Sequence, residues 1–410
     1  MKKSFSSSQK TLLTICIAIY TSAYVCRLNL SAALGSISDA FSLTMPQAGL
    51  LQTLFAVLYA AGQFINGTIV DHVNPVRHML TGIAGTAVCN FAMGLCPSYH
   101  ALLAVWSVNA FFQSMMWTPI VRLIALHFHD ETLRIYAQGA LAFTLVVGHF
   151  SAWLISGFLS AYVVWRYSFI VPAAIAAVVC LLSIRLFARH DAIRVLPPTP
   201  RSASGTAHVS GSALHIFAAS GFLLVLFTCV LYGFIRDCVI TWTPSILGRL
   251  SPSGAVSSAF TLILPAINMV GVYLGFALRI RGTNPYAVIV IMMIFSALCS
   301  ALLLPGCGML LLSILLGLIC AAMYGANTML TALIPMEYDR VGRTGMAAGL
   351  IDSFIYLGSA LSGVIGGYIY EQIGPASLYS TWILASVVSA VLVHAGARIS
   401  RRFWHQYNPS

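Results

Sequence analysis

The sequence predicts an all-α membrane protein, with twelve transmembrane helices arranged in two pseudo-symmetric six-helix bundles. Of its 410 residues, 59% are hydrophobic and 8% are charged, whereas a soluble domain typically has about 25% charged residues. Apolar windows of about 20 residues, the length that crosses a bilayer as a helix, recur along the chain. Features of the first half also recur in the second half. These three observations together predict the fold class.

Each apolar window is interpreted as one transmembrane helix. The first window resembles a secretory signal, but no small-residue cleavage site follows it, so we interpret it as the first span. The predicted spans are residues 11–35, 48–70, 78–96, 101–128, 136–160, 168–187, 214–247, 258–279, 285–304, 308–333, 344–370 and 377–397.

A polar segment separates two halves with six predicted helices each. Residues 188–213 are rich in Pro, Ser and Gly, which is typical of an exposed linker. We therefore expect an N-terminal bundle over residues 1–187, a cytoplasmic linker over 188–213 and a C-terminal bundle over 214–410.

Three features of the first half recur in the second at a separation of 206 to 210 residues. Such a constant separation indicates a duplicated six-helix unit. Transporters built from two parallel halves bind their substrate between the halves, near the middle of the bilayer. The recurring features are Arg27 with Arg236, Asn74–Pro75 with Asn284–Pro285, and Gly139 with Gly345.

The basic residues are distributed unevenly between the two sides of the predicted membrane protein. The chain has 21 Lys and Arg residues and a net charge of +11. If the N-terminus is cytoplasmic, the outer loops contain just Arg166 and Arg249, and most of the other basic residues face the cytoplasm. This asymmetry follows the positive-inside rule. We therefore expect a multi-pass protein of the cytoplasmic membrane with both termini inside, and no nucleic-acid partner.

Two arginines lie deep within predicted spans, where a charge costs about 2.5–3.5 kcal/mol on insertion scales. Arg27 lies in the first span, and Arg236 lies in the seventh. Tyr20 and Tyr24 share a helix face with Arg27 because of their spacing. Such polar faces are expected to line a water-filled cavity. A further polar face is predicted on the second span, from Gln52, Tyr59, Gln63 and Asn66.

We expect Arg27 and Arg236 to bind one small anion from opposite sides. A guanidinium group is permanently charged, and its planar fork binds phosphate or carboxylate through paired hydrogen bonds. The alternative is that each arginine anchors neighbouring helices through backbone carbonyls or a carboxylate. Asp237 adjoins Arg236, but side chains at i and i+1 diverge by about 100°. We therefore expect Asp237 to pair with another helix.

Three more ionisable residues lie within predicted spans. Asp352 has Tyr356 at i+4 on the same face, and such intramembrane carboxylates carry protons in transporters. The alternative for Asp352 is a packing role beside an arginine. His149 is a candidate for anion binding or proton coupling, because its charge changes near neutral pH; otherwise it serves as a hydrogen-bonding residue. Arg122 is expected to reach the nearby membrane interface.

The loop GTIVDHVNPVRH after the second span combines Gly67, Asp71 and Arg77. Glycine lets helices approach closely, and an acid can accept hydrogen bonds at a helix end, so we expect these residues to form a cytoplasmic gate. No G-x-S-x-G, P-loop or H-E-x-x-H motif occurs, and the ten cysteines form no C-x-x-C pair. We therefore expect no enzyme activity, no cofactor and no metal site.

The same loop resembles the signature of the major facilitator superfamily, with His72 in place of the usual Arg or Lys. The Trp165–Phe169 motif, W-R-x-x-F, extends the similarity, which then spans essentially the whole chain. More specifically, four segments are similar to the organophosphate:phosphate antiporter family, which includes the glycerol-3-phosphate and hexose-phosphate transporters. These segments are YVCRLNLSAAL, GQFINGTIVDHVNPVR, MWTPIVR and YGFIRDCVITWTPSIL.

The resemblance implies the major facilitator fold and a role for individual residues. Arg27 and Arg236 match the family's phosphate-binding arginines, and His149 falls at its binding histidine. The tyrosines that match pocket-lining positions are Tyr20, Tyr24, Tyr59 and Tyr356. The chain departs from the family where Gln63 and Leu28 replace lysines and where Thr241 replaces an aspartate. The implied pocket therefore has fewer cations.

We expect a secondary transporter that moves a small organic anion by alternating access and functions as a monomer in the bilayer. A phosphorylated metabolite is favoured, and a carboxylate such as a sugar acid is the second choice. Coupling through phosphate exchange and through proton symport, by Asp352 or His149, both remain open. The alternative function is a sugar-phosphate sensor of the same fold with little transport.

Overall fold

The computed structural model describes residues 5–43, 45–189, 212–248 and 263–407, and every regular element in these ranges is helical. The described residues fall into two compact units. Unit 1 comprises Met1–Ser204 and Thr344–Ser353, and unit 2 comprises Gly205–Arg343 and Phe354–Ser410. Most of the predicted linker and the start of the predicted span 258–279 lie outside the described residues. The predicted domain boundaries therefore stay a prediction.

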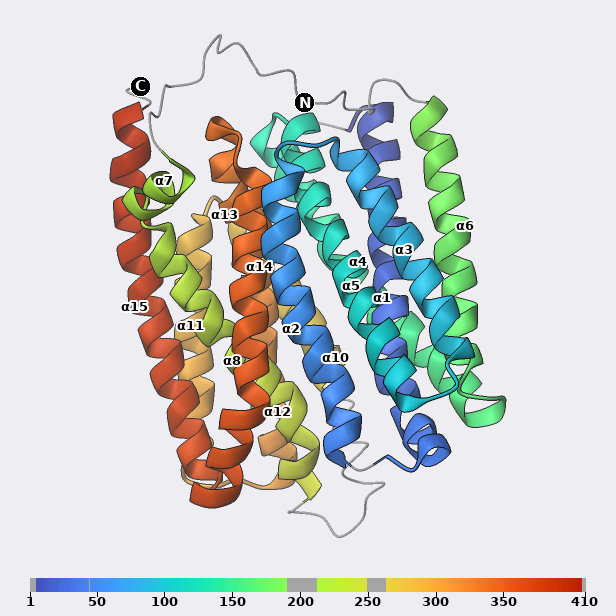
Figure 1. Cartoon of the computed structure of the whole chain (residues 1–410). Coiled ribbons are helices and arrows are strands. Elements are labelled where there is room, and N and C mark those ends of the chain that lie inside the picture. The colour runs from blue at the N-terminus through green and yellow to red at the C-terminus, as the bar shows by residue number, and fades with distance from the viewer. Residues whose placement is uncertain (1–4, 44, 190–211, 249–262, 408–410) are drawn as a thin grey trace. The chain divides into compact units, whose positions relative to one another are not determined.

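Unit 1 is built from six long helices. Helix α4 packs against α2 and α3, while α1 packs against α5 and α6 (Figure 1). Large apolar side chains that are fully buried, such as Leu12, Trp106 and Phe169, fill the space between these helices. The helices are α1 (Ser7–Phe41), α2 (Met45–Val70), α3 (Pro75–Leu95), α4 (Tyr99–His127), α5 (Glu131–Tyr162) and α6 (Tyr167–Arg189).

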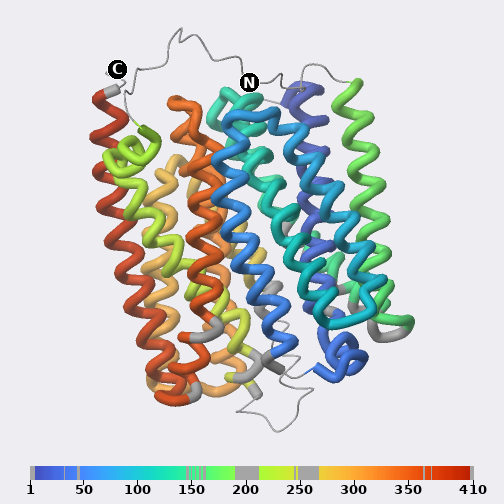
Figure 2. Tube along the Cα trace, viewed as in Figure 1, coloured from blue at the N-terminus to red at the C-terminus, as the bar shows by residue number. Residues whose placement is uncertain are grey.

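In unit 2, helix α15 packs along both α8 and α11, and Figure 2 shows it as the long red tube beside them. Helix α12 contacts α8, α10 and α11. Helix α14 (Thr344–Leu361) is divided between the two units after Ser353. The other helices are α7 (Ala213–Ala219), α8 (Phe222–Gly248), α10 (Ile263–Ile280), α11 (Pro285–Ala301), α12 (Met309–Thr328), α13 (Ile334–Met336) and α15 (Pro375–Tyr407).

The Asn–Pro pair that recurs in the sequence begins a helix in each unit. Asn74 caps α3, and its Oδ1 accepts a hydrogen bond from the Val76 N–H at 2.9 Å. Asn284 caps α11 in the same way, accepting from the Tyr286 N–H at 2.9 Å. The proline that follows each asparagine has the φ that a first helical residue requires and lacks an N–H that would need a partner. The repeated sequence therefore produces the same helix start twice.

Several predicted spans differ from the observed helices, as three examples show. The predicted span 214–247 is broken at Gly221, which has a φ of +75° that glycine adopts without steric cost. The span predicted over 308–333 continues through the π-helical turn Met329–Leu333, α13 and a 3₁₀ turn to Val341. The last predicted span ends at 397, but α15 continues to Tyr407, because its final turns are helical without being apolar.

Seven helices in the described part of the chain are long and apolar enough to cross a membrane, by length and composition. Helix α4 is not among them, since it contains polar residues such as Asn109, Gln113 and Arg122. The all-α prediction is confirmed. The seven segments are Ser7–Ser31, Gln47–Val70, Tyr167–Arg189, Phe222–Thr243, Met309–Val341, Thr344–Leu361 and Pro375–Gln406.

Candidate functional site

Arg27 lies within unit 1 and contacts both a polar side chain and aromatic rings. Its Nε donates a hydrogen bond to Oε1 of Gln113 on α4 at 2.9 Å. Its guanidinium carbon lies 4.4 Å from the ring centroid of Tyr59 and 5.4 Å from that of Tyr24. The ring of Phe55 lies at 5.8 Å. A neutral amide and aromatic ring faces position the guanidinium without neutralising its positive charge.

The predicted tyrosines of unit 1 form one cluster of side chains with Arg27, which we call the Arg27 cluster. The ring of Tyr20 packs against Tyr24 at 5.0 Å and against Trp117 at 4.8 Å. The hydroxyl of Tyr59 accepts a hydrogen bond from Nε2 of Gln63 at 2.7 Å. The structure therefore brings Tyr20, Tyr24, Tyr59 and Gln63 together around Arg27.

Gln113 also belongs to the Arg27 cluster, since it accepts a hydrogen bond from Arg27, and it was not predicted from the sequence. It is fully buried, and its Nε2 has no hydrogen-bond partner among the described residues. The same holds for Oε1 of Gln63. A buried amide in an apolar span, one turn before Trp117 in the segment FFQSMMWTP, was a signal that could have identified it.

Arg236 in unit 2 forms a bidentate ion pair with the residue that follows it. Its Nε donates to Asp237 Oδ1 at 2.8 Å, and its Nη2 donates to Asp237 Oδ2 at 3.1 Å. The prediction that Asp237 pairs with another helix is therefore wrong. Adjacent side chains do diverge where they leave the helix, but the long arginine stem bends and carries the guanidinium back to the neighbouring carboxylate.

Arg236 also connects α8 to α14 within unit 2. Its Nη2 donates to Ser359 Oγ at 3.3 Å, and its guanidinium carbon lies 5.4 Å from the ring of Tyr232. The Tyr232 hydroxyl donates to Oδ1 of Asn327 on α12 at 2.9 Å. The sequence reasoning did not identify Asn327, because spacing along one helix does not indicate contacts made by another helix.

The other predicted site residues are placed as follows. Asp352 is 6% exposed and lies in the part of α14 that belongs to unit 1. Its neighbour Ser353 donates a hydrogen bond to the Ala60 carbonyl oxygen of α2 at 2.7 Å. Tyr356 is half-buried and belongs to unit 2. His149 lies in α5, and its side chain is outside the described residues.

Asp71, which follows α2, caps the first turn of α14 within unit 1. Its Oδ1 accepts from the Gly345 N–H at 2.9 Å, and its Oδ2 accepts from the Met346 N–H at 2.8 Å. Oδ1 also lies 3.8 Å from Nη1 of Arg122, whose side chain is 11% exposed. Arg122 therefore pairs with a buried acid, whereas the sequence predicted that it would reach the interface.

Gly67 allows α2 to approach α14 closely. A Cβ at Gly67 would lie 2.7 Å from the Cα of Gly349 and 2.8 Å from the carbonyl oxygen of Gly345, so a side chain at this position would force the helices apart. The structure brings Gly67 and Asp71 together at α14 and leaves Arg77 exposed at the start of α3. The predicted part of Arg77 in the gate stays a prediction.

Comparisons with known proteins agree with this arrangement of helices. The family model of the Major Facilitator Superfamily matches residues 13–338. The glycerol-3-phosphate transporter of Bacillus subtilis is 25% identical over 412 residues, which cover 92% of this chain and 91% of that protein. The membrane sensor protein UhpC of Salmonella typhimurium is 32% identical over 123 residues, but the match spans 30% of this chain and about a quarter of the sensor, 27%.

A solved structure shows the same fold. The crystal structure of the transporter FucP in the outward conformation matches with a TM-score of 0.71 and 13% sequence identity, over 94% of this chain and 98% of that one. The family match covers most of the helices described above. The chain is therefore a multi-pass membrane protein that belongs to the Major Facilitator Superfamily.

Proposed function

We propose that the chain is a secondary transporter of a small organic anion, in which Arg27 and Arg236 bind the anion and transport proceeds by alternating access. The observation that carries this proposal is the placement of Arg27, a permanent charge held inside unit 1 by Gln113 and aromatic rings. Charged side chains within membrane spans are costly, and they mark substrate or ion pathways.

The surroundings of Arg27 suit an anion that carries several oxygen atoms. The guanidinium fork binds two oxygens of a phosphate or carboxylate at once. The buried Nε2 of Gln113, which has no partner among the described residues, is a neutral donor that can bind a third oxygen. Tyr24 and Tyr59 offer hydroxyls and ring faces to the organic part of the substrate, as expected for a small-molecule site.

A phosphorylated metabolite is the favoured substrate class. The long alignment to a glycerol-3-phosphate transporter and the shorter one to a probable hexose phosphate transport protein of Chlamydia muridarum support this choice. Gln63 adds a neutral amide to the Arg27 cluster, and the Arg236–Asp237 pair is neutral overall. Both features are compatible with a singly charged carboxylate such as a sugar acid, which remains the second choice.

We infer the orientation and the gate from the same residues. The distribution of arginine and lysine supports a cytoplasmic position for both termini. In this orientation Gly67 and Asp71 contact the start of α14 on the cytoplasmic side and act as a gate. The roles of His149 and Arg77, and function as a monomer, stay predictions from the sequence.

A ligand screen followed by transport assays tests the proposal. The purified protein is first heated with glycerol-3-phosphate, hexose phosphates and sugar acids, because a ligand that binds the folded form raises the apparent melting temperature. The labelled hit is then taken up by proteoliposomes. We expect Arg27→Lys and Arg236→Lys to reduce uptake about tenfold or more, since each loses charge-assisted hydrogen bonds worth about 1.5–3 kcal/mol each.

Arg185 provides the matched control for these substitutions. It is exposed on α6 of unit 1, so Arg185→Lys should transport like the unchanged protein. Full transport by Arg27→Lys or by Arg236→Lys would contradict the assignment of that arginine as an anion ligand.

A sensor that binds a sugar phosphate without appreciable transport is the second candidate function. The 32% identity to a membrane sensor protein over 123 residues supports it. The same experiment separates the two functions. Thermal stabilisation by a sugar phosphate without any uptake would favour the sensor, and rapid uptake by proteoliposomes containing this chain alone would exclude it.

A further inference from the structure

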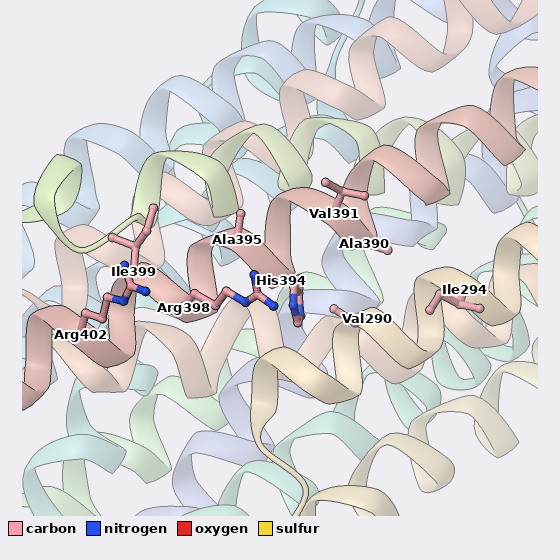
Figure 3. A pocket seen from close by; sticks show the side chains of 9 residues that line it. All are labelled: Val290, Ile294, Ala390, Val391, His394, Ala395, Arg398, Ile399 and Arg402. Atoms are coloured by element: carbon pink, nitrogen blue, oxygen red, sulfur yellow. The ribbon is translucent and has the colours of Figure 1, made fainter.

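A groove on unit 2 lies between α11 and α15 (Figure 3), and neither Arg236 nor its partners line it. It has a volume of about 610 Å³. Its floor and walls come from two helices that pack against each other along their length. The lining residues are Val290 and Ile294 of α11, and Ala390, Val391, His394, Ala395, Arg398, Ile399 and Arg402 of α15.

One side of the groove is basic. His394, Arg398 and Arg402 follow one another at four-residue spacing, and Figure 3 shows them in a row along α15. All three are exposed, and none forms an ion pair with a carboxylate in the part of the chain that the structure describes. None of the nine lining residues is acidic. The groove is therefore complementary to a negatively charged ligand.

The rest of the groove is apolar and exposed. Ile294 is 49% exposed and Val391 is 63% exposed, and both lie toward the middle of their helices relative to the arginines (Figure 3). A free phosphate ion would use the arginines and leave this apolar part uncovered. An amphipathic ligand with a negative headgroup and a hydrocarbon chain matches both parts of the groove.

The position of the groove along α15 matches the depth of a lipid headgroup. The arginines lie in the last turns of the candidate membrane span Pro375–Gln406, where long basic side chains extend toward the membrane surface. Basic pockets between transmembrane helices bind anionic phospholipid headgroups at this depth. We propose that this groove binds an anionic glycerophospholipid, with its phosphate on Arg398 and Arg402 and an acyl chain along Ile294 and Val391.

The test measures the phospholipid that stays bound after purification. The full chain is reconstituted into phosphatidylcholine nanodiscs with or without phosphatidylglycerol, extracted in mild detergent, and examined by native mass spectrometry. We expect bound phosphatidylglycerol on the unchanged protein. The double variant Arg398→Gln/Arg402→Gln should bind it about 25-fold more weakly, because each basic residue near the surface contributes about a factor of five.

Two other variants separate the lipid from a free phosphate and from a general charge effect. Arg401→Gln is the matched control, since Arg401 lies outside the groove and its Nε donates to the Ala397 carbonyl at 3.3 Å; it should retain phosphatidylglycerol. Val391→Trp fills the apolar part without changing the charge and should also lose the lipid. Inorganic phosphate at millimolar concentration should displace little of it.

Several outcomes would overturn the proposal. One is that the double variant retains as much phosphatidylglycerol as the unchanged protein. Another is that Arg401→Gln loses as much lipid as the double variant. A third is that the unchanged protein retains phosphatidylcholine as well as phosphatidylglycerol. Complete displacement by inorganic phosphate, or full binding by Val391→Trp, would instead indicate a site for a free anion. If the double glutamine variant does not fold, Arg398→Lys/Arg402→Lys keeps the charge, and it should retain the lipid.

Discussion

The half-buried arginines Arg27 and Arg236 have different partners, and this difference affects how each can bind an anion. The contacts of Arg27 include a neutral amide and aromatic rings. Arg236 instead directs its Nε and Nη2 to the Asp237 carboxylate. These two nitrogens form one edge of the guanidinium fork, the edge that a phosphate or carboxylate ligand would also use. If Arg236 binds the transported anion, as proposed, we expect Asp237 to compete with that anion for the same edge of the guanidinium.

Replacing Asp237 by asparagine tests this competition. Asp237→Asn removes the negative charge but keeps the shape of the side chain, so we expect the apparent affinity for the transported anion to increase. The increase should be about fivefold, because a partly exposed ion pair contributes up to about 1 kcal/mol. Isothermal titration calorimetry on the purified protein measures this change directly.

Weaker anion binding by Asp237→Asn would contradict the competition. The carboxylate would then hold Arg236 in its binding position. Ser359→Ala serves as the control, since Ser359 accepts a longer hydrogen bond of 3.3 Å from Arg236 and carries no charge. It should change the affinity less than Asp237→Asn does.

The residues around Arg27 also show what helix periodicity can predict. Tyr20 and Tyr24 share a face with Arg27 because they lie on one helix, and this follows from spacing alone. Gln113 lies on another helix, and its contact with Arg27 depends on how α1 and α4 pack. The Arg236–Asp237 pair depends on the bend of a flexible side chain, which spacing does not describe.

Helix starts need partners for their first N–H groups, and α14 obtains them from a distant part of the sequence. Its own N-cap residue, Arg343, makes no side-chain capping bond. Asp71 accepts hydrogen bonds from two of these N–H groups, those of Gly345 and Met346, and places a negative charge at the positive end of the helix. The order of the first turn of α14 should therefore depend on Asp71.

Hydrogen exchange tests the dependence of α14 on this cap. In Asp71→Ala the amides of Gly345 and Met346 lose their acceptors, and we expect their exchange to accelerate about tenfold. Loss of a capping side chain costs about 0.5–2 kcal/mol, and 1.4 kcal/mol corresponds to a factor of ten. Hydrogen–deuterium exchange with mass spectrometry resolves this segment.

Asp130 provides the matched control for the capping experiment. It caps α5 by accepting from the Leu133 N–H at 3.1 Å. Asp130→Ala should accelerate exchange at the start of α5 and leave α14 unchanged. Unchanged exchange at Gly345 and Met346 in Asp71→Ala would show that the close approach of Gly67 to α14 holds this turn without the carboxylate.

The element boundaries show where sequence patterns are informative. The Asn–Pro pairs mark the starts of α3 and α11 because a capping side chain and a proline act locally. The break before α8 was missed, since one glycine in an apolar run does not by itself indicate a positive φ. The π-helical turn at Met329–Leu333 was missed as well, because it leaves the apolar pattern uninterrupted.

At the scale of the whole chain, the two halves share local features, but their polar centres differ. Each unit has an Asn–Pro helix start and a half-buried candidate site arginine, Arg27 in unit 1 and Arg236 in unit 2. The neutral amide beside Arg27 is replaced by a carboxylate beside Arg236. A duplicated unit therefore keeps its helix starts, while the chemistry around its arginine changes. The internal repeat in the sequence predicts the shared helix starts and arginines, but it does not predict the different partners of the two arginines.

Asp352 allows the two coupling mechanisms to be distinguished in the whole protein. It is buried in α14, the helix that both units share. If transport is coupled to protons, a carboxylate in this position must gain and lose a proton in each cycle. Asparagine imitates the protonated form permanently. We therefore expect Asp352→Asn to keep exchange of labelled for unlabelled anion but to lose accumulation driven by a pH gradient.

Proteoliposomes measure both activities in the same preparation. A gradient that is acidic outside should drive accumulation by the unchanged protein and by the control Asp130→Asn, because asparagine also caps a helix. Asp352→Asn should lose at least tenfold in accumulation, with its exchange rate within about threefold of normal. Accumulation by Asp352→Asn equal to that of the unchanged protein would exclude Asp352 as the proton carrier. Dependence of uptake on internal phosphate would then support phosphate exchange as the driving reaction.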